Sequence, residues 1–274
     1  MRNNSRSIEA SAKAAKPSAA PAGSQTLLRG LDLLEAVTAG PVALAELSTM
    51  LQLNRSTVHR LASALVDRGY LKFVPREGYM LGAKLLELGY SARQQIDLPR
   101  VARPVLEKLA EQTEDTVHLG LLDGNKALYV DKIPGRRRID ISSRVGERHP
   151  LCSTGLGKAL LLDSSRDEWR AHFEAEAGRG HHPAGKFQEW VDNMRTYAAG
   201  GYSFDLEENE DRIRCVGAPV RDESGRIVAA ISVASVAQYM DDARMNELIG
   251  TVTSAADEIS KELGWVPVPR GKKK

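Results

Sequence analysis

The chain has 274 residues, enough for two domains that each bury a core of their own. Its 38 Lys and Arg residues nearly balance 36 Asp and Glu residues, so any basic surface for nucleic acid has to be local. The two cysteines give no disulfide framework and no metal-ligand spacing, and no apolar run is long enough for a bilayer span or a signal peptide. We therefore expect a cytoplasmic protein without a membrane partner.

Both ends of the chain have the composition of tails. Residues 1–23 are rich in Ala, Ser, Asn, Pro and Lys, so they cannot bury enough apolar area to offset the entropy of ordering. We expect this basic segment to be disordered; contact with phosphates is a possible use, and a plain tail is the simpler interpretation. Residues 266–274 are interpreted as a second basic tail.

Residues 43–70 are predicted to form two helices joined by a tight turn, after a first helix that Ser24 caps and that ends near Gly40. The first helix has an apolar stripe on which the pair is expected to pack, made of Leu27, Leu28, Leu31 and Leu34. In the last helix Asn54 is a favourable N-cap, and Gly69 can adopt the left-handed conformation that ends a helix. Its buried stripe is predicted to be Val58, Leu61, Ala62, Leu65 and Val66.

The opposite face of this last helix carries hydroxyl and basic side chains that suit DNA. Arg can donate two hydrogen bonds to guanine, Ser and Thr can bond phosphates or base edges, and a helix N-terminus favours phosphate. These residues alone leave two interpretations open. One is a helix-turn-helix whose second helix enters the major groove, and the other is an ordinary helical hairpin with a solvated polar face.

The following residues favour DNA binding. Residues 70–74 and 79–81 alternate around a turn that contains Pro75 and Gly78, which predicts a β-hairpin and, with the three helices, a winged helix-turn-helix over residues 24–82. Residues 83–97 are predicted to be a linker helix with an apolar side for pairing. The candidate contacts to double-stranded DNA are Arg29, Asn54, Arg55, Ser56, Thr57, His59, Arg60 and, on the wing, Lys72 and Arg76.

Several separated motifs resemble the IclR family of transcriptional regulators. In the first half they are LAEL (44–47), NRSTVHRL (54–61), GYL (69–71) and YMLG (79–82). In the second half they are PLCSTGLGKAL (150–160), GYSFDLEENE (201–210) and RCVGAPV (214–220). The resemblance covers residues 24–264 and implies a homo-oligomer, a dimer or a dimer of dimers, that binds operator DNA and responds to a small organic acid.

Residues 98–265 read as an α+β domain with one antiparallel sheet, and the resemblance implies that it is GAF-like. Asp123 and Gly124 between two strand-like runs are a strong hairpin signal. The predicted helices are 104–113, 153–162, 169–175, 190–199 and 241–263. The predicted strands are 116–122, 127–133, 139–141, 202–205, 213–220 and 227–235.

The segment 153–157 places hydroxyls and backbone N–H groups at a helix start, where a carboxylate or phosphate could bind. A tightly packed helix start is an equally good interpretation. A phosphate-binding loop is rejected because Cys152 occupies the position of its first glycine and Ala159 follows Lys158.

The resemblance implies an effector pocket built from this loop, an acidic residue after the Gly-Tyr pair, and the last two strands. The candidate effector-binding residues are Ser153, Thr154, Gly155, Leu156, Asp205, Cys215 and Ser232. Where the family often has a second serine, this chain has Ala234, which removes one hydrogen-bond donor.

Other polar clusters have simpler interpretations. Within the acidic run 205–211 only Asp205 is expected to point inward, and Cys215 is more often a core residue than a nucleophile because no base is adjacent to it. His181 and His182 are interpreted as surface residues, and the run 136–138 as a solvated loop. We expect no metal and no cofactor.

The leading hypothesis is a DNA-binding regulator that represses a catabolic operon. The residues 204–209 most resemble the branch of the family that senses 2-keto-3-deoxygluconate and related sugar acids; aromatic acids and glyoxylate are the alternatives. Two other classes were weighed. An enzyme using Cys215 or Asp205 leaves the wing unexplained, and a protein-interaction adaptor would not bind duplex DNA.

Overall fold

The computed structural model describes residues 24–137, 141–177 and 187–266. Its contacts divide the chain into two compact units, residues 1–95 and 96–274. Each unit has its own apolar core and is described here by itself.

The first unit is a winged helix-turn-helix. Its elements are α1 (Gln25–Ala36), α2 (Leu44–Met50), α3 (Arg55–Asp67), β1 (Leu71–Val74), β2 (Gly78–Leu81) and α4 (Ala83–Gln95). The two strands pair antiparallel, and Val42 adds a single bridge to Tyr79. Gly78 is required at this place because a Cβ would lie 2.2 Å from the carbonyl oxygen of Val42, and because φ is +116°.

The core of this unit confirms the stripe predicted for α3 and changes the one predicted for α1. Val58, Leu61 and Ala62 are buried as expected. On α1, however, Leu33 and Val37 are the buried side chains, and three of the four predicted leucines are exposed, namely Leu27, Leu28 and Leu31. A row of leucines at helical spacing shows that one face is apolar, but the packing decides which face is covered. Ser24 precedes α1 as predicted, but its backbone is helical and its side chain makes no capping hydrogen bond.

The second unit is built on one six-stranded antiparallel sheet. Its helices are α5 (Leu98–Thr113), α6 (Gly155–Leu160), α7 (Arg166–Ala177), α8 (Phe187–Gly200) and α9 (Asp242–Glu262), with a 3-10 turn η1 (Ala237–Tyr239). Its strands are β3 (Thr116–Asp123), β4 (Lys126–Ile133), β5 (Arg148–His149), β6 (Ser203–Leu206), β7 (Ile213–Arg221) and β8 (Ile227–Val236). The strand order β5-β4-β3-β8-β7-β6 confirms the predicted α+β class.

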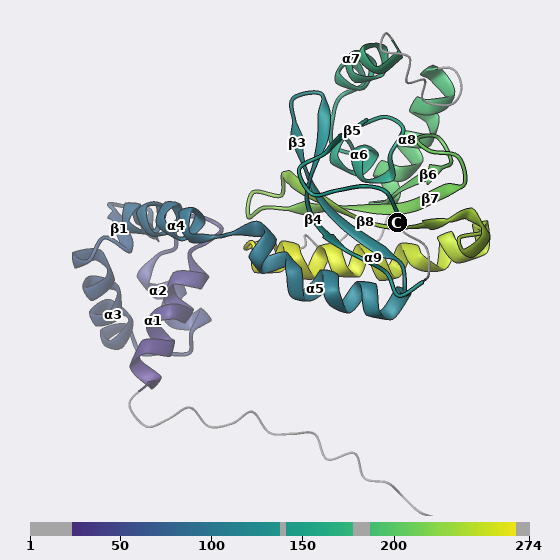
Figure 1. Ribbon diagram of the computed structural model, residues 1–274. Helices are drawn as coiled ribbons and strands as arrows, with labels where there is room; N and C mark the ends of the chain where they lie inside the picture. Colours follow the sequence, from purple (N-terminus) through teal and green to yellow (C-terminus); the bar gives the residue numbers. More distant parts are fainter. Residues whose placement is uncertain (1–23, 138–140, 178–186, 267–274) are drawn as a thin grey trace, which may run out of the picture. The chain divides into compact units, whose positions relative to one another are not determined.

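The two faces of this sheet are covered differently (Figure 1). Helices α5 and α9 lie across one face, where their apolar side chains form a large core with β3, β7 and β8. On the other face α6 contacts β6, β7 and β8, and the aromatic side chains of α7 and α8 pack around Trp190. The short α6 leaves part of this second face without a helix over it.

Two boundaries differ from prediction. Helix α5 begins at Leu98, six residues before the expected start at Pro104, because Asp97 caps it and Pro99 fits its first turn. Pro104, the expected first residue, instead lies inside the helix. The strand predicted over 139–141 falls mostly outside the described residues; Ile141 is in no strand, and β5 pairs with β4 instead.

Candidate functional site

The start of α3 is held by a local hydrogen-bond motif. The Asn54 side-chain oxygen accepts the backbone N–H of Thr57 at 2.8 Å, as predicted for an N-cap, and it also accepts the Ser56 hydroxyl at 2.9 Å. Asn54 and Ser56 are therefore bonded to each other and to the helix. Gly69, with φ +74°, ends the helix in the predicted left-handed conformation.

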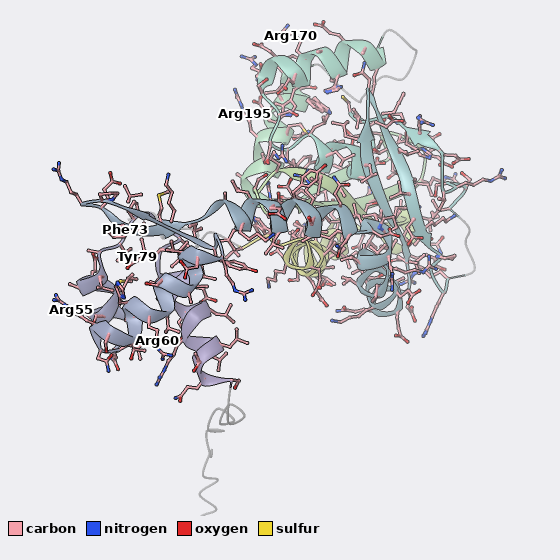
Figure 2. The ribbon with its side chains drawn as sticks, turned by 90° about the vertical axis from the view of Figure 1, so that its left-hand side faces the viewer. Arg55, Arg60, Phe73, Tyr79, Arg170 and Arg195 are labelled. Carbon is pink, nitrogen blue, oxygen red and sulfur yellow. The ribbon has the colours of Figure 1, made fainter. Side chains whose placement is uncertain are left out.

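The outer face of α3 is basic and exposed. Arg55, His59 and Arg60 are exposed, and Figure 2 shows the side chains of Arg55 and Arg60 extending outward from the helix. Thr57 is half-buried, as is Arg29 on α1. On the hairpin Lys72 and Arg76 are exposed, and Phe73 packs against Tyr79 at a centroid distance of 5.2 Å. Guanidinium groups on a helix of this kind can reach guanine edges, and lysine or arginine on a wing can contact phosphates.

A cavity lies on the α6 side of the sheet in the second unit. The centre of a water molecule can move through about 40 Å³ of it, room for a few water molecules. Most of its lining residues carry a polar side-chain group, and none of those among the described residues is a lysine or arginine. The lining residues are His118, Tyr129, Ile141, Ser142, Ser143, His149, Thr154, Asp205, Asn209, Glu210, Ile213, Cys215, Ser232 and Ala234.

Strand register explains how distant residues meet in this cavity. His118 on β3 is paired with Ser232 on β8, and Cys215 on β7 is paired with both Ala234 on β8 and Asp205 on β6. Paired residues point to the same side of an antiparallel sheet, and Ser232 and Ala234 are two positions apart on β8, so the side chains form two neighbouring rows on one face. The cavity therefore brings together four of the seven predicted effector-binding residues, which are Thr154, Asp205, Cys215 and Ser232.

The other three predicted residues lie in the packing around α6. Ser153 and Leu156 are buried, and the Leu156 side chain packs against the backbone of Gly120. Gly155 permits close approach to β7, because a Cβ there would lie 2.6 Å from the Cys215 sulfur. None of the three lines the cavity.

The first-turn N–H groups of α6 have partners within the chain. Thr154 accepts the N–H of Gly157 at 3.0 Å and donates to the carbonyl of Pro150 at 2.6 Å. The N–H groups of Gly155 and Leu156 bond to the Cys215 sulfur. The helix start is thus tightly packed against β7.

Burial governs the charges in the cavity. Asp205 is 3% exposed, and desolvation raises its pKa to about 7, although Lys158 and the backbone N–H of Glu208 act in the opposite direction. Burial, together with the charges of Lys132 and His149, lowers the pKa of His118 to about 3, so this ring is neutral at physiological pH. Burial also raises the pKa of the Cys215 thiol, which removes the thiolate that nucleophilic catalysis requires.

Lys158 is a buried cation that the sequence did not single out as part of this region. Its ammonium group bonds the Phe204 carbonyl at 2.7 Å and the Glu208 carboxylate. Glu208 was predicted to be a solvated residue of the acidic run; it is instead half-buried because it pairs with Lys158. Asp205 points inward as predicted.

Within the run 136–138, Arg136 is exposed as predicted for a solvated loop, whereas Arg137 is half-buried. Arg137 bonds the buried carboxylate of Asp115 at 2.8 Å and lies over the ring of Tyr239. Arg244 on α9 bonds the same carboxylate. Arg138, like His181 and His182, falls outside the described residues.

Sequence reasoning missed the cavity wall on the β3–β4 side. His118, Tyr129, Ser143 and His149 line it, and two exposed residues of the rim, Asn209 and Glu210, complete it. The one available signal was a histidine inside an apolar strand-like run, at His118. Such a residue is more often a satisfied core group than a ligand contact.

The described part of the chain offers neither a metal-binding cluster nor a membrane-spanning helix. No group of three His, Cys, Asp or Glu side chains there could hold a metal ion. No helix there has the length and apolar character needed to cross a bilayer.

Comparison with known proteins assigns the family. Residues 26–75 match the model described as the IclR helix-turn-helix domain, and residues 90–261 match the model described as bacterial transcriptional regulator IclR C-terminal. The chain belongs to the IclR family of bacterial transcriptional regulators. This confirms the resemblance and the expectation of a DNA-binding regulator rather than an enzyme, because the matched families and relatives are regulators.

Curated relatives match over most of their length. The HTH-type transcriptional regulator XynR of Escherichia coli is 31% identical over 246 residues, which cover 88% of this chain and 98% of the relative. The HTH-type transcriptional regulator KdgR of Escherichia coli is 32% identical and is covered to 88%, with 83% of this chain. The acetate operon repressor of Salmonella typhimurium is 32% identical, with 88% and 90% covered.

Solved structures of IclR-family proteins share the fold. The Agobacterium tumefaciens repressor BlcR superposes with a TM-score of 0.75 at 23% identity, over 88% of this chain and 98% of that one. Pseudomonas aeruginosa HmgR gives 0.77 at 21% identity, over 89% and 99%. The C-terminal domain of Escherichia coli KdgR gives 0.53 at 29% identity, over 62% of this chain and all of that domain.

Proposed function

We propose that this IclR-family regulator represses a catabolic operon in the cytoplasm, where bacterial DNA lies, and that a small organic acid bound in the β3–β8–β7–β6 cavity relieves repression. The observation that carries the proposal is the cavity itself. Hydroxyl, imidazole and carboxyl groups from five strands and the α6 start converge there. Convergent polar groups in a closed space, in a domain separate from the DNA-binding helix, are what a ligand-controlled regulator needs.

The chemistry of the lining favours a sugar acid such as 2-keto-3-deoxygluconate. Ser143, Ser232 and Asn209 can exchange hydrogen bonds with hydroxyl groups, and Asp205 can accept them. An aromatic acid would instead require an apolar slot, and the apolar lining side chains are few. Relatives named as repressors support repression as the direction of control.

Cavity size favours a second candidate, glyoxylate. A cavity with room for only a few water molecules suits an acid of two or three carbons, whereas a six-carbon acid needs the wall to move. The rim residues Ser142, Asn209 and Glu210 are exposed and pack in no core, so this part of the wall can move to enlarge the cavity. Movement of the rim on binding would also supply the structural change that a switch requires.

Helix α4 provides a surface for pairing two copies. None of its residues is buried within the chain, and Leu86 and Tyr90 are 78% and 67% exposed, one turn apart. Two-fold pairing would set the spacing of two α3 helices on a palindromic operator. Sedimentation of the wild type and of Leu86→Glu tests this step, because a dimer through α4 should dissociate in the variant.

A thermal-shift screen of the full chain tests the effector. We expect 2-keto-3-deoxygluconate to raise the melting temperature more than glyoxylate or a benzoic acid, and to release duplex DNA in a gel shift. Asp205→Ala should lose the response to ligand and keep DNA binding. Asp211→Ala, an exposed carboxylate of the same segment, is the matched control. A wild type that binds DNA but responds to none of the acids would refute this function.

A further inference from the structure

Two histidines and a tyrosine are stacked along one wall of the cavity. The Tyr129 ring lies between His118 and His149, with centroid distances of 4.9 Å and 4.4 Å. His118 and Tyr129 are buried, and all three side chains line the cavity. They lie on β3, β4 and β5, whereas the four predicted residues that the cavity brings together lie on β6, β7 and β8 and at the start of α6.

The two nitrogens of His118 differ in their surroundings. Nε2 lies 2.7 Å from the hydroxyl oxygen of Ser143, whereas Nδ1 is buried and has no hydrogen-bond partner among the described residues. Buried polar atoms are normally paired, and an unpaired one costs free energy that a suitable partner recovers. Nε2 of His149 on the same wall is also buried without a hydrogen-bond partner, but it lies 3.4 Å from a carboxylate oxygen of Glu147. Nδ1 of His118 has no such neighbour among the described residues, so a ligand can supply its missing bond.

The ring cannot easily turn to satisfy Nδ1 elsewhere, because Ser143 is itself held. The ammonium group of Lys132 bonds the carbonyl oxygens of Ile141 and Ser143, at 2.5 Å and 2.8 Å. This clamp positions the Ser143 hydroxyl, and the Ser143 hydroxyl positions the imidazole. On the neighbouring strand Ser232 is the direct partner of His118, so a ligand bonded to Ser232 lies beside the ring.

The required partner can be named from the chemistry of a neutral imidazole. If Nε2 donates to Ser143, Nδ1 is an acceptor and needs a donor; if Ser143 donates to Nε2, Nδ1 carries hydrogen and needs an acceptor. A carboxylate or keto oxygen satisfies only the second arrangement. A hydroxyl group satisfies both, because it donates and accepts.

We propose that His118 Nδ1 hydrogen-bonds a hydroxyl group of the effector and makes the cavity select a hydroxylated 2-keto acid over one without hydroxyls. This inference rests on the proposed function, since it specifies the ligand of the same cavity. His118 is thereby a specificity-determining residue that the family motifs in this chain do not contain.

A pair of substitutions separates the two nitrogens. In His118→Asn the amide can occupy the place of Nδ1 and the bond to Ser143 is lost; in His118→Gln the longer amide can reach Ser143 and the polar atom at Nδ1 is lost. The full-length variants and the wild type are titrated calorimetrically with 2-keto-3-deoxygluconate and with pyruvate, which keeps the 2-keto acid end and lacks the hydroxylated tail. The preference, the ratio of the two affinities, is the readout, so a general loss of stability cancels.

We expect His118→Gln to reduce the wild-type preference by about tenfold, and His118→Asn to retain most of it. A merely structural role through Ser143 predicts the reverse order. The reverse order, unchanged preference in both variants, or equal loss in both would overturn the assignment of Nδ1. A wild type that binds neither acid would refute the proposed function, and the inference with it.

A measurement on the wild type covers the case in which a substituted chain does not fold. With ¹⁵N-labelled histidine, the Nδ1 resonance of His118 should shift on addition of 2-keto-3-deoxygluconate and stay in place with pyruvate. An unchanged chemical shift of Nδ1 when the hydroxylated acid is bound would overturn the proposal.

Discussion

Helix α3 and the cavity of the second unit both gather polar groups, but they do so in opposite ways. On α3 the side chains are exposed and lie within a few residues of each other, from Arg55 to Arg60. In the cavity they are buried and come from positions as far apart as His118 and Ser232. The comparison shows that residues close in the sequence can create an exposed polar surface on one helix, whereas the polar groups of the cavity meet only through strand register.

The electrostatics of the two regions differ for the same reason. Solvent surrounds the arginines of α3, so salt controls the range over which they attract phosphate. In the cavity desolvation neutralises His118 and raises the pKa of Asp205 to about 7. Binding to α3 should therefore respond to ionic strength, and the cavity should respond to pH.

The largest effect is expected on α3. Arg60→Ala should weaken binding to a duplex selected from a randomised pool by about a hundredfold, because one arginine contact to guanine contributes about 1–3 kcal/mol of discrimination. Gel-shift titration measures this loss. Arg68→Ala, at the far end of the same helix, is the control and should bind as the wild type does, because recognition helices use their N-terminal residues. Equal operator affinity in Arg60→Ala and wild type would remove α3 from the interface.

An intermediate effect is expected from the titration of Asp205 in the cavity. Its pKa is higher in the folded chain than in the unfolded chain, so the folded state holds the proton between about pH 4 and pH 7. The stability that this group contributes is greatest at low pH, falls as the pH rises to about 7, and is constant above. Relative to Asp205→Asn, the wild type should lose on the order of 2 kcal/mol between pH 5 and pH 8.

Denaturant unfolding of the second unit at several pH values measures this difference. His118 contributes to stability in the opposite sense, because its pKa is lower in the folded chain and its stabilising effect grows as the pH rises toward the pKa of the unfolded chain. This contribution is present in both proteins, so it cancels in the comparison. Asp211→Asn, an exposed carboxyl in the same segment, should follow the wild type. Parallel pH profiles for wild type and Asp205→Asn would show that Asp205 titrates as a solvated group.

The smallest effect is expected at the cap of α3. Asn54→Ala removes the acceptor for the Thr57 N–H and should lower the stability of the first unit by about 1 kcal/mol. Asn54→Asp keeps an acceptor and should stay within a few tenths of the wild type. Thermal unfolding followed by circular dichroism compares the two. A loss of equal size in both would show that the side chain acts through something other than the cap.

Local signals predicted most of the first unit, but not the cap or the covered face of α1. The cap at Asn54, the end at Gly69 and the hairpin around Gly78 each depend on a few adjacent residues, and all are present. The covered face of α1 depends on what packs against it, and there the prediction selected Leu27 and Leu31 where the fold buries Leu33. Amphipathic spacing is a property of one helix, whereas the packing of the three helices together determines which side chains are buried.

For the second unit the sequence by itself determined the class, the order of helices and strands apart from β5, and the inward position of Asp205. These follow from periodicity, turn residues and short motifs, which act within a few residues. Only the tertiary structure decided that Ser153, Gly155 and Leu156 serve packing, and that His118, Tyr129 and His149 form the opposite wall. The reason is physical: strand register joins residues over a hundred positions apart, and no local pattern carries that pairing.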